Sequence, residues 1–142
     1  VADLYASTGS SLVEVFRRAR PPNDDFAHPT VLYDEAPGWI SDGWGATVEA
    51  GEPGHFGARP RASEWWLWRS TANQSVRCTL SGGFPPAVVV YRGDSLGELV
   101  RVADNLAGGM PSRSFVLRTE PGVSYRFVID RDPGVADRHR IQ

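Results

Sequence analysis

Short runs in which apolar and polar residues alternate follow one another along much of this chain. In SVRCTLS (75–81), RSFVLRT (113–119) and SYRFVID (124–130), apolar residues recur at every second position over most of the run. A period of two is typical of a β-strand that has one buried and one solvated face. The pattern therefore predicts a strand in each run, with the single cysteine, Cys78, on the buried face of the first.

Two further runs are apolar on both faces. AVVVYRG (87–93) begins with five apolar residues in succession, which predicts a strand in the middle of a sandwich. EWWLWRS (64–70) places Trp66 and Trp68 on one face and Trp65 on the other. Such a strand must expose one of its aromatic faces or cover it, and the run itself does not indicate what the cover would be.

Pairs of turn-forming residues separate these runs. They stand at Pro37-Gly38, Asp42-Gly43, Pro53-Gly54, Gly82-Gly83, Gly108-Gly109, Pro121-Gly122 and Pro133-Gly134. Short strands between such turns predict an all-β fold, an antiparallel β-sandwich. Two other runs have weaker patterns. SLGELVRVA (95–103) could form a short helical turn, and SLVEVFRRA (11–19) fits a strand slightly better than a short helix.

Composition and charge fit a globular domain and argue against several partners. The chain has 142 residues, 41% of them hydrophobic and 23% charged, which suits one domain with a single core. A net charge of -2 argues against nucleic acid or an anionic membrane surface. No apolar run approaches the roughly 18 residues of a membrane span. Because the sequence starts at Val1 without a signal peptide, we expect a processed chain or a segment of a longer polypeptide.

Five motifs stand in a characteristic order along the chain. They are PPNDDFAHPTVL, GATVEAGEPGHFG, SEWWLWRS, VVVYRGDSLGELVRVADN and PGVSYRFVID. Over roughly residues 22 to 130, this order resembles the bacterial pre-peptidase C-terminal domain family. The resemblance implies a non-catalytic β-sandwich, jelly-roll-like, in a secreted or cell-surface protein. Modules of that family are appended to exported enzymes or strung in tandem on surface proteins.

Carboxylates near two of the motifs are candidate calcium ligands, namely Asp24, Asp25, Glu52 and Asp104. Calcium needs six to eight oxygen ligands, and this chain departs from the family where further ligands would stand. It has Pro85-Pro86 before the central strand, and Leu106-Ala107 after Asn105, where aspartates are common in the family. The alternative is that Asn23 and Asp24 accept backbone N–H bonds in a turn. Calcium is therefore disfavoured, and no other cofactor is expected.

The motif GEPGHFG carries the residues closest to a catalytic pair. Glu52 and His55 lie three apart and could polarise a water or hold zinc. One glutamate and one histidine do not complete a zinc site, so we favour a tight loop in which both side chains bond the backbone. The sequence has no Gly-x-Ser-x-Gly elbow, and Cys78 is expected in the core rather than as a nucleophile. We therefore expect no enzymatic activity.

The tryptophans leave three interpretations open. Exposed indole rings stack on sugars, so Trp39, Trp44, Trp65 and Trp68 could form a carbohydrate platform. Trp65 or Trp66 could instead mark an interface with a neighbouring domain, since an aromatic strand face needs a cover. The third interpretation is that these rings belong to the domain's own core.

The two ends of the chain resemble each other, and this suggests a repeat. Val1-Ala2-Asp3 can be aligned with Val128-Ile129-Asp130, and a turn-rich stretch and then a strand-like run follow each. On this interpretation residues 1–19 are the tail of a preceding unit or a connector, residues 20–22 are a Pro-rich joint, and residues 23–142 form the sandwich. The alternative is that residues 1–19 pair with the sheet of their own domain.

These inferences favour a non-catalytic extracellular module with a structural or adhesive role. It would stand in a tandem array or a self-assembled polymer, with contacts through residues 1–22. The alternative is a carbohydrate- or substrate-binding accessory module of a secreted hydrolase, with a polysaccharide as its partner.

Overall fold

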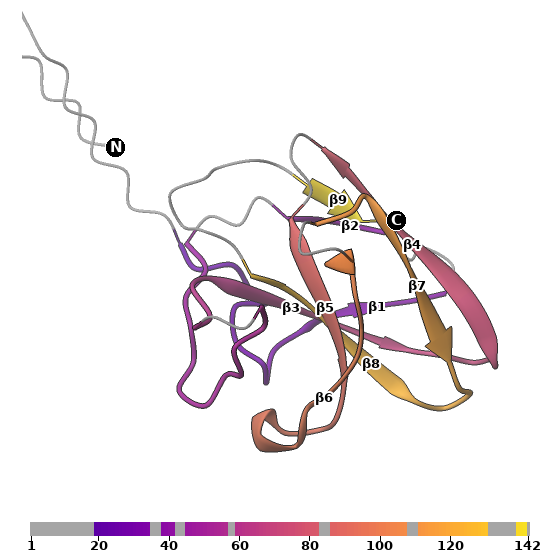
Figure 1. Ribbon diagram of the computed structural model, residues 1–142. Helices are drawn as coiled ribbons and strands as arrows, with labels where there is room; N and C mark the ends of the chain where they lie inside the picture. Colours follow the sequence, from indigo (N-terminus) through magenta and orange to yellow (C-terminus); the bar gives the residue numbers. More distant parts are fainter. Residues whose placement is uncertain are drawn as a thin grey trace, which may run out of the picture.

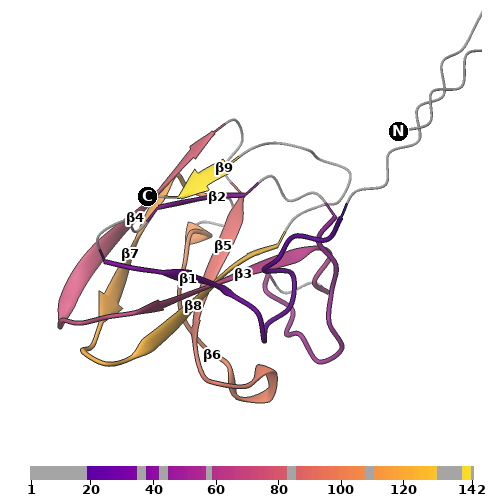
Figure 2. The same ribbon diagram turned by 180° about the vertical axis from the view of Figure 1, so that it is seen from behind.

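The protein folds into two facing β-sheets with no α-helix among the described residues (Figures 1 and 2). The structure is a computed structural model that describes residues 19–34, 38–41, 45–56, 59–82, 86–107, 111–130 and 139–141. The first sheet has five strands in the order β1 (Thr30–Leu32), β3 (Ser63–Arg69), β8 (Ser124–Asp130), β5 (Ala87–Arg92) and β6 (Val100–Asp104). The second has four, in the order β2 (Trp39–Ser41), β9 (His139–Ile141), β4 (Gln74–Gly82) and β7 (Ser114–Thr119).

Neighbouring strands are antiparallel, except that the short edge strand β1 runs parallel to β3. The predicted all-β sandwich is therefore confirmed. Strands next to each other in a sheet are mostly distant in sequence, because every connection between successive strands except the one from β5 to β6 crosses from one sheet to the other. None of the helical segments in the described ranges has the length and apolar character to cross a membrane.

The strands predicted from alternation are the long ones. β3, β4, β5, β7 and β8 coincide with the five predicted runs to within a few residues. The expected helical turn at 95–103 is right only for the 3-10 helix Leu96–Glu98; the remainder forms β6, which pairs with β5. Of the run at 11–19, residues 11–18 lie outside the described residues. The central strand β5 is buried on both faces, as its apolar run predicts.

The main core lies between the two sheets. It comprises Leu32, Trp66, Trp68, Cys78, Leu80, Val88, Val90, Phe115, Leu117, Tyr125, Phe127 and Ile129. The two-residue period brings alternate residues of each strand to this layer. Cys78 is among them, and burial raises the pKa of its thiol to about 12. A thiol with that pKa is protonated near neutral pH, so the expected core role of Cys78 is confirmed.

A second apolar cluster lies on the opposite, outer face of the five-stranded sheet. Its buried members are Phe26, Trp65, Val89, Tyr91 and Val128. Two segments of the same chain cover it, residues 19–29 before β1 and residues 45–56 before β3, and both lie beside β3 in Figures 1 and 2. We call these two segments the clasp. The second aromatic face of β3 is therefore covered by segments of the same chain.

Candidate functional site

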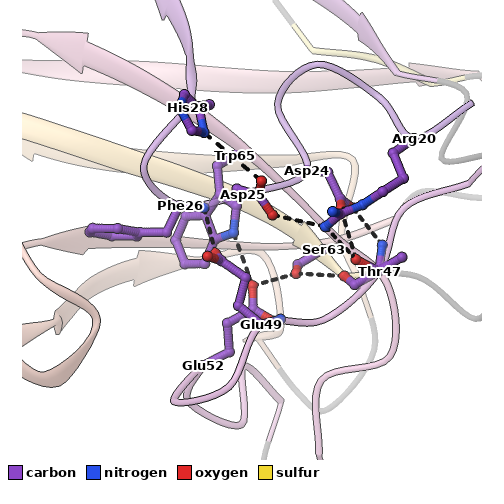
Figure 3. Close-up of polar contacts among 10 residues, drawn as sticks. All are labelled: Arg20, Asp24, Asp25, Phe26, His28, Thr47, Glu49, Glu52, Ser63 and Trp65. Atoms are coloured by element: carbon purple, nitrogen blue, oxygen red, sulfur yellow. Dashed lines mark hydrogen bonds and ion pairs between the residues drawn. The ribbon is translucent and has the colours of Figure 1, made fainter.

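The clasp holds most of the polar residues that the sequence marks as candidate ligands, and Figure 3 shows how they lie. Asn23 attaches the first segment to β3, because its backbone carbonyl accepts the N–H of Trp65 at 2.8 Å and its side-chain amide donates to the Trp65 carbonyl at 3.1 Å. Thr47 attaches the second segment, where its carbonyl accepts the N–H of Ser63 at 3.0 Å. Asn23 and Thr47 therefore continue the edge of the sheet beyond β1.

Asp24 ties the two clasp segments together. It is buried, and Oδ1 accepts the backbone N–H of Thr47 while Oδ2 accepts the Thr47 hydroxyl at 2.7 Å. Nε of Arg20 also donates to Oδ2, and this hydrogen bond is the main reason that the pKa of Arg20 is raised. The backbone N–H that Asp24 accepts comes from a loop far along the chain, whereas the sequence suggested a local turn. Both carboxylate oxygens are thus occupied by protein donors.

Asp25 and Asp104, two further predicted ligands, also have protein partners. Asp25 accepts from the Arg20 guanidinium at 2.8 Å, and His28 lies 3.9 Å from its other oxygen. Asp104, on β6, pairs with Arg101 at 2.8 Å and accepts the backbone N–H of Leu106 at 2.7 Å. These contacts leave Asp104 in a separate ion pair at the edge strand.

Glu52 is placed against the indole of Trp65. Its Oε1 accepts from Nε1 of Trp65 at 3.0 Å and from the hydroxyl of Ser63, and its Oε2 accepts the backbone N–H of Glu49 at 3.2 Å. Burial raises the pKa of Glu52 although these hydrogen bonds oppose the shift. The expected loop is present at Gly51, which has a positive φ of 95°, and Glu52 bonds the backbone as expected. The side chain of His55 does not follow the expectation, because it bonds the Tyr91 hydroxyl rather than the backbone.

Phe26 closes the outer face from the first clasp segment. Its ring meets the Trp65 ring edge-on, with 5.2 Å between centroids, and its backbone N–H donates to Oε2 of Glu49 at 2.5 Å. The Arg126 guanidinium lies over the Phe26 ring, 4.0 Å from its centroid. Arg126 also donates to the carbonyls of Gly93 at 3.0 Å and Phe26 at 3.3 Å. A planar guanidinium suits this combination of stacking and two hydrogen bonds.

His55 is the most enclosed polar residue of the clasp. It is 0% exposed, its Nδ1 lies 3.0 Å from the Tyr91 hydroxyl, and its ring packs against Trp65 with 5.5 Å between centroids. Among the described residues, Nε2 of His55 has no hydrogen-bond partner. Burial lowers the pKa of His55 to about 4 and raises the pKa of Tyr91 to about 12. Both groups are therefore neutral near pH 7, buried among aromatic rings and away from solvent.

The predicted metal ligands do not form a common site. Asp24, Asp25 and Glu52 lie in the clasp but face Arg20, Thr47, Ser63 and Trp65, and Asp104 lies apart on β6. Within the described ranges, no three His, Cys, Asp or Glu side chains are grouped so that they could hold a metal ion. The Arg20 guanidinium already pairs with both Asp24 and Asp25. The geometry assigns these carboxylates to loop closure.

The tryptophans of β3 are not surface residues, and this corrects the platform and interface interpretations for all three. Trp65 is 0% exposed beneath the clasp, while Trp66 at 2% and Trp68 at 8% face the main core. A ring buried within its own domain can neither stack on a sugar nor pack against a neighbour. Trp39 lies in β2, where only its backbone is described, and Trp44 lies outside the described residues.

Several residues that build the clasp gave little or no signal in the sequence. Their partners lie between 11 and 100 positions away; the residues are Thr47, Glu49, Ser63, Tyr91 and Arg126. A weak signal was available for Arg126, which interrupts the apolar run of β8 on the outer face. Asn105 was identified only as a departure from a ligand pattern. It is fully buried, and its amide bonds the backbone of Val88, Pro86 and Ser112 at 2.8 to 3.0 Å.

Comparisons with models of protein families, with curated protein sequences and with solved structures found no match to this chain. The resemblance to the pre-peptidase C-terminal domain family therefore rests on the five motifs alone.

Proposed function

We propose that this chain is a non-catalytic extracellular β-sandwich module with a structural or adhesive role, related to the pre-peptidase C-terminal domains. The observation that carries the proposal is the set of contacts that the polar residues of the five motifs make. Among the motif residues that could do chemistry, Asn23, Asp24, Glu52 and His55 are engaged in closing the clasp over the outer face of β3.

The surroundings of the ionisable side chains in the clasp also support a non-catalytic role. A general acid or base must reach the proton that it transfers, but His55 is fully buried and its Nδ1 faces Tyr91. Glu52 is held by two donors on a single oxygen. These groups favour one closed loop arrangement, which suits a module that must survive outside the cell without disulfides.

The assembly part of the proposal concerns residues 1–22. We place the module in a tandem array or a self-assembled polymer, with residues 1–18 as the connector to a neighbouring unit. Residues 19–22 belong to the clasp, since Arg20 pairs with Asp24 and Asp25 and the carbonyl of Ala19 lies where a side chain at Gly45 would stand. A truncation that removes the connector should therefore stop at residue 18, so that the shortened chain keeps Ala19 and Arg20.

Sedimentation velocity and negative-stain microscopy of the full chain and of a chain lacking residues 1–18 test this proposal. The proposal expects oligomers or filaments from the full chain and monomers from the shortened one, with the same unfolding midpoint for both. Monomers from both chains at high concentration would contradict self-assembly. A hydrolytic activity that depends on Glu52 or His55 would contradict the non-catalytic role.

A further inference from the structure

The clasp covers only part of the outer face of the five-stranded sheet. Val31 on β1 and Leu67 on β3 are register partners, and both lie on this outer face because Leu32 and Trp68, next along the strands, face the main core. Val31 remains 48% exposed. Beside these two residues lies an open groove of about 680 Å³, which runs from the β1 edge to the turn between β7 and β8.

The groove combines an apolar floor with a few fixed polar groups. Tyr33 lines it and is 67% exposed, which leaves most of its ring open to solvent. Asp34, the next residue, is held in place by two donors: Nε1 of Trp68 at 2.8 Å to Oδ1 and the Thr71 hydroxyl at 2.9 Å to Oδ2. Arg69 also lines the groove, and in the described part of the chain no carboxylate pairs with its guanidinium.

We propose that this groove binds a neutral saccharide of one or two pyranose units. The apolar C–H face of a pyranose packs on the electron-rich face of an aromatic ring, and Tyr33 offers such a face at a groove wall. A fixed acceptor, Asp34, and a planar donor, Arg69, suit the vicinal hydroxyls of a sugar. Their opposite charges favour a neutral ligand over a uronic acid or a phosphate.

The size and composition of the groove agree with this ligand class. Ligand sites commonly measure about 300 to 1,000 Å³ and have mainly apolar walls with a small number of oriented polar groups. The site differs from a tryptophan platform, since its aromatic residue is Tyr33 and the buried Trp68 acts only through its indole N–H. It does not depend on the structural role proposed above, because a monomeric or an assembled chain would present the same groove.

Trp68 supplies a direct reporter, since its indole N–H bonds a groove carboxylate. The test is a titration of the ¹⁵N-labelled full chain with cellobiose, maltose, chitobiose and xylobiose, followed by the Trp68 Nε1–H resonance and the amides of residues 31–34 and 67–71. We expect saturable shifts at these resonances with at least one disaccharide in the millimolar range. Tyr33→Ala should weaken that binding by about tenfold, whereas Tyr33→Phe should retain it because the ring is kept.

Val100→Ala is the matched control, because Val100 is an exposed apolar residue on the opposite edge strand, and it should leave the binding unchanged. The Tyr33 variants should keep the wild-type unfolding midpoint. An absence of shifts with all four disaccharides would overturn the proposal. An unchanged dissociation constant in Tyr33→Ala would overturn it as well. If the resonances of the groove residues shift with protein concentration when no sugar is present, the groove binds a second copy of the chain. That outcome would also overturn the proposal.

Discussion

The indole Nε1–H of Trp65 donates a 3.0 Å hydrogen bond to Oε1 of Glu52. The indole is fully buried on the outer face of β3, and Glu52 reaches it from a loop that precedes the strand. Because Ser63 donates to the same oxygen, one carboxylate satisfies two buried donors. This relationship explains how a strand with aromatic residues on both faces remains inside a single domain.

Replacement of Glu52 by alanine should destabilise the protein substantially. The change leaves the Trp65 indole N–H without its acceptor and the Ser63 hydroxyl with only its longer contact, to the Thr47 carbonyl at 3.3 Å, at an expected cost of about 2 to 4 kcal/mol. Glu120→Ala is the control, because the exposed side chain of Glu120 forms a surface ion pair with Arg92, so its loss should cost less than about 1 kcal/mol. Urea unfolding of both variants gives the comparison, and equal effects would refute the buried role of Glu52.

The stability of the protein should decrease as the pH falls from 7 to 5. The pKa of His55 is about 4 in the folded protein and 6.5 as its ordinary value, so the unfolded chain takes up a proton first. The stabilisation from neutral His55 is complete above pH 6.5 and is lost as the pH falls toward 4, by about 2 kcal/mol between pH 7 and pH 5. Glu52, whose pKa is raised, opposes this trend near its own pKa.

Unfolding curves at several pH values, recorded for the wild type and two histidine variants, isolate the His55 effect. His55→Gln should remove most of the decrease between pH 7 and pH 5, at a cost in stability at pH 7. His28→Gln should retain the decrease, since His28 is exposed and only approaches Asp25. A decrease that survives in His55→Gln would show that another group is responsible.

Replacement of Arg126 by lysine should loosen the first clasp segment. Lysine keeps the charge but loses the planar contact with Phe26 and the paired donors to two carbonyls. We expect a loss of about 1 to 2 kcal/mol and faster hydrogen exchange of the backbone amides at 24–28. Arg118→Lys, on the exposed face of β7, should change neither quantity. Similar exchange rates in the two variants would argue against the clamp formed by Arg126.

Calcium should have little effect on stability. Asp24 and Asp25 are paired with Arg20, and Glu52 is occupied by Ser63 and Trp65. A cation would have to displace these donors, so we expect millimolar Ca²⁺ or EDTA to shift the unfolding midpoint by less than about 1 °C. Differential scanning calorimetry measures this directly. A rise of several degrees with Ca²⁺, lost in Asp24→Asn, would restore the calcium hypothesis.

Much of the fold was predictable because its long strands carry their pattern locally. The alternation in β4, β7 and β8 predicts which residues face the core, and the apolar run of β5 predicts a strand that is buried on both faces. β1 and β2 were not predicted, since each has three residues, whereas β9 coincides with the strand-like run near 138–141 that the comparison of the two chain ends suggested. Three residues are too few to show a period, and such strands exist only because a longer neighbour offers them an edge.

The site was less predictable, because its chemistry depends on contacts between distant segments. The sequence identified Asp24, Glu52 and Trp65 as notable, but their roles follow from Thr47, Ser63 and the fold that brings them together. The sequence alone does not distinguish a carboxylate that binds calcium from one that accepts a hydrogen bond from an indole N–H. The groove at Tyr33 gave no signal, since a single exposed tyrosine after a three-residue strand has no characteristic pattern.

Hydrogen exchange of the Trp65 indole N–H, followed by NMR in the monomeric chain, tests the account most directly. The clasp predicts that this proton exchanges as slowly as the backbone amides of β5 and β8, at a rate that does not depend on protein concentration. Exchange within minutes in the dilute monomer, with protection only at high concentration, would contradict the account. It would place Trp65 at an interface between copies of the chain.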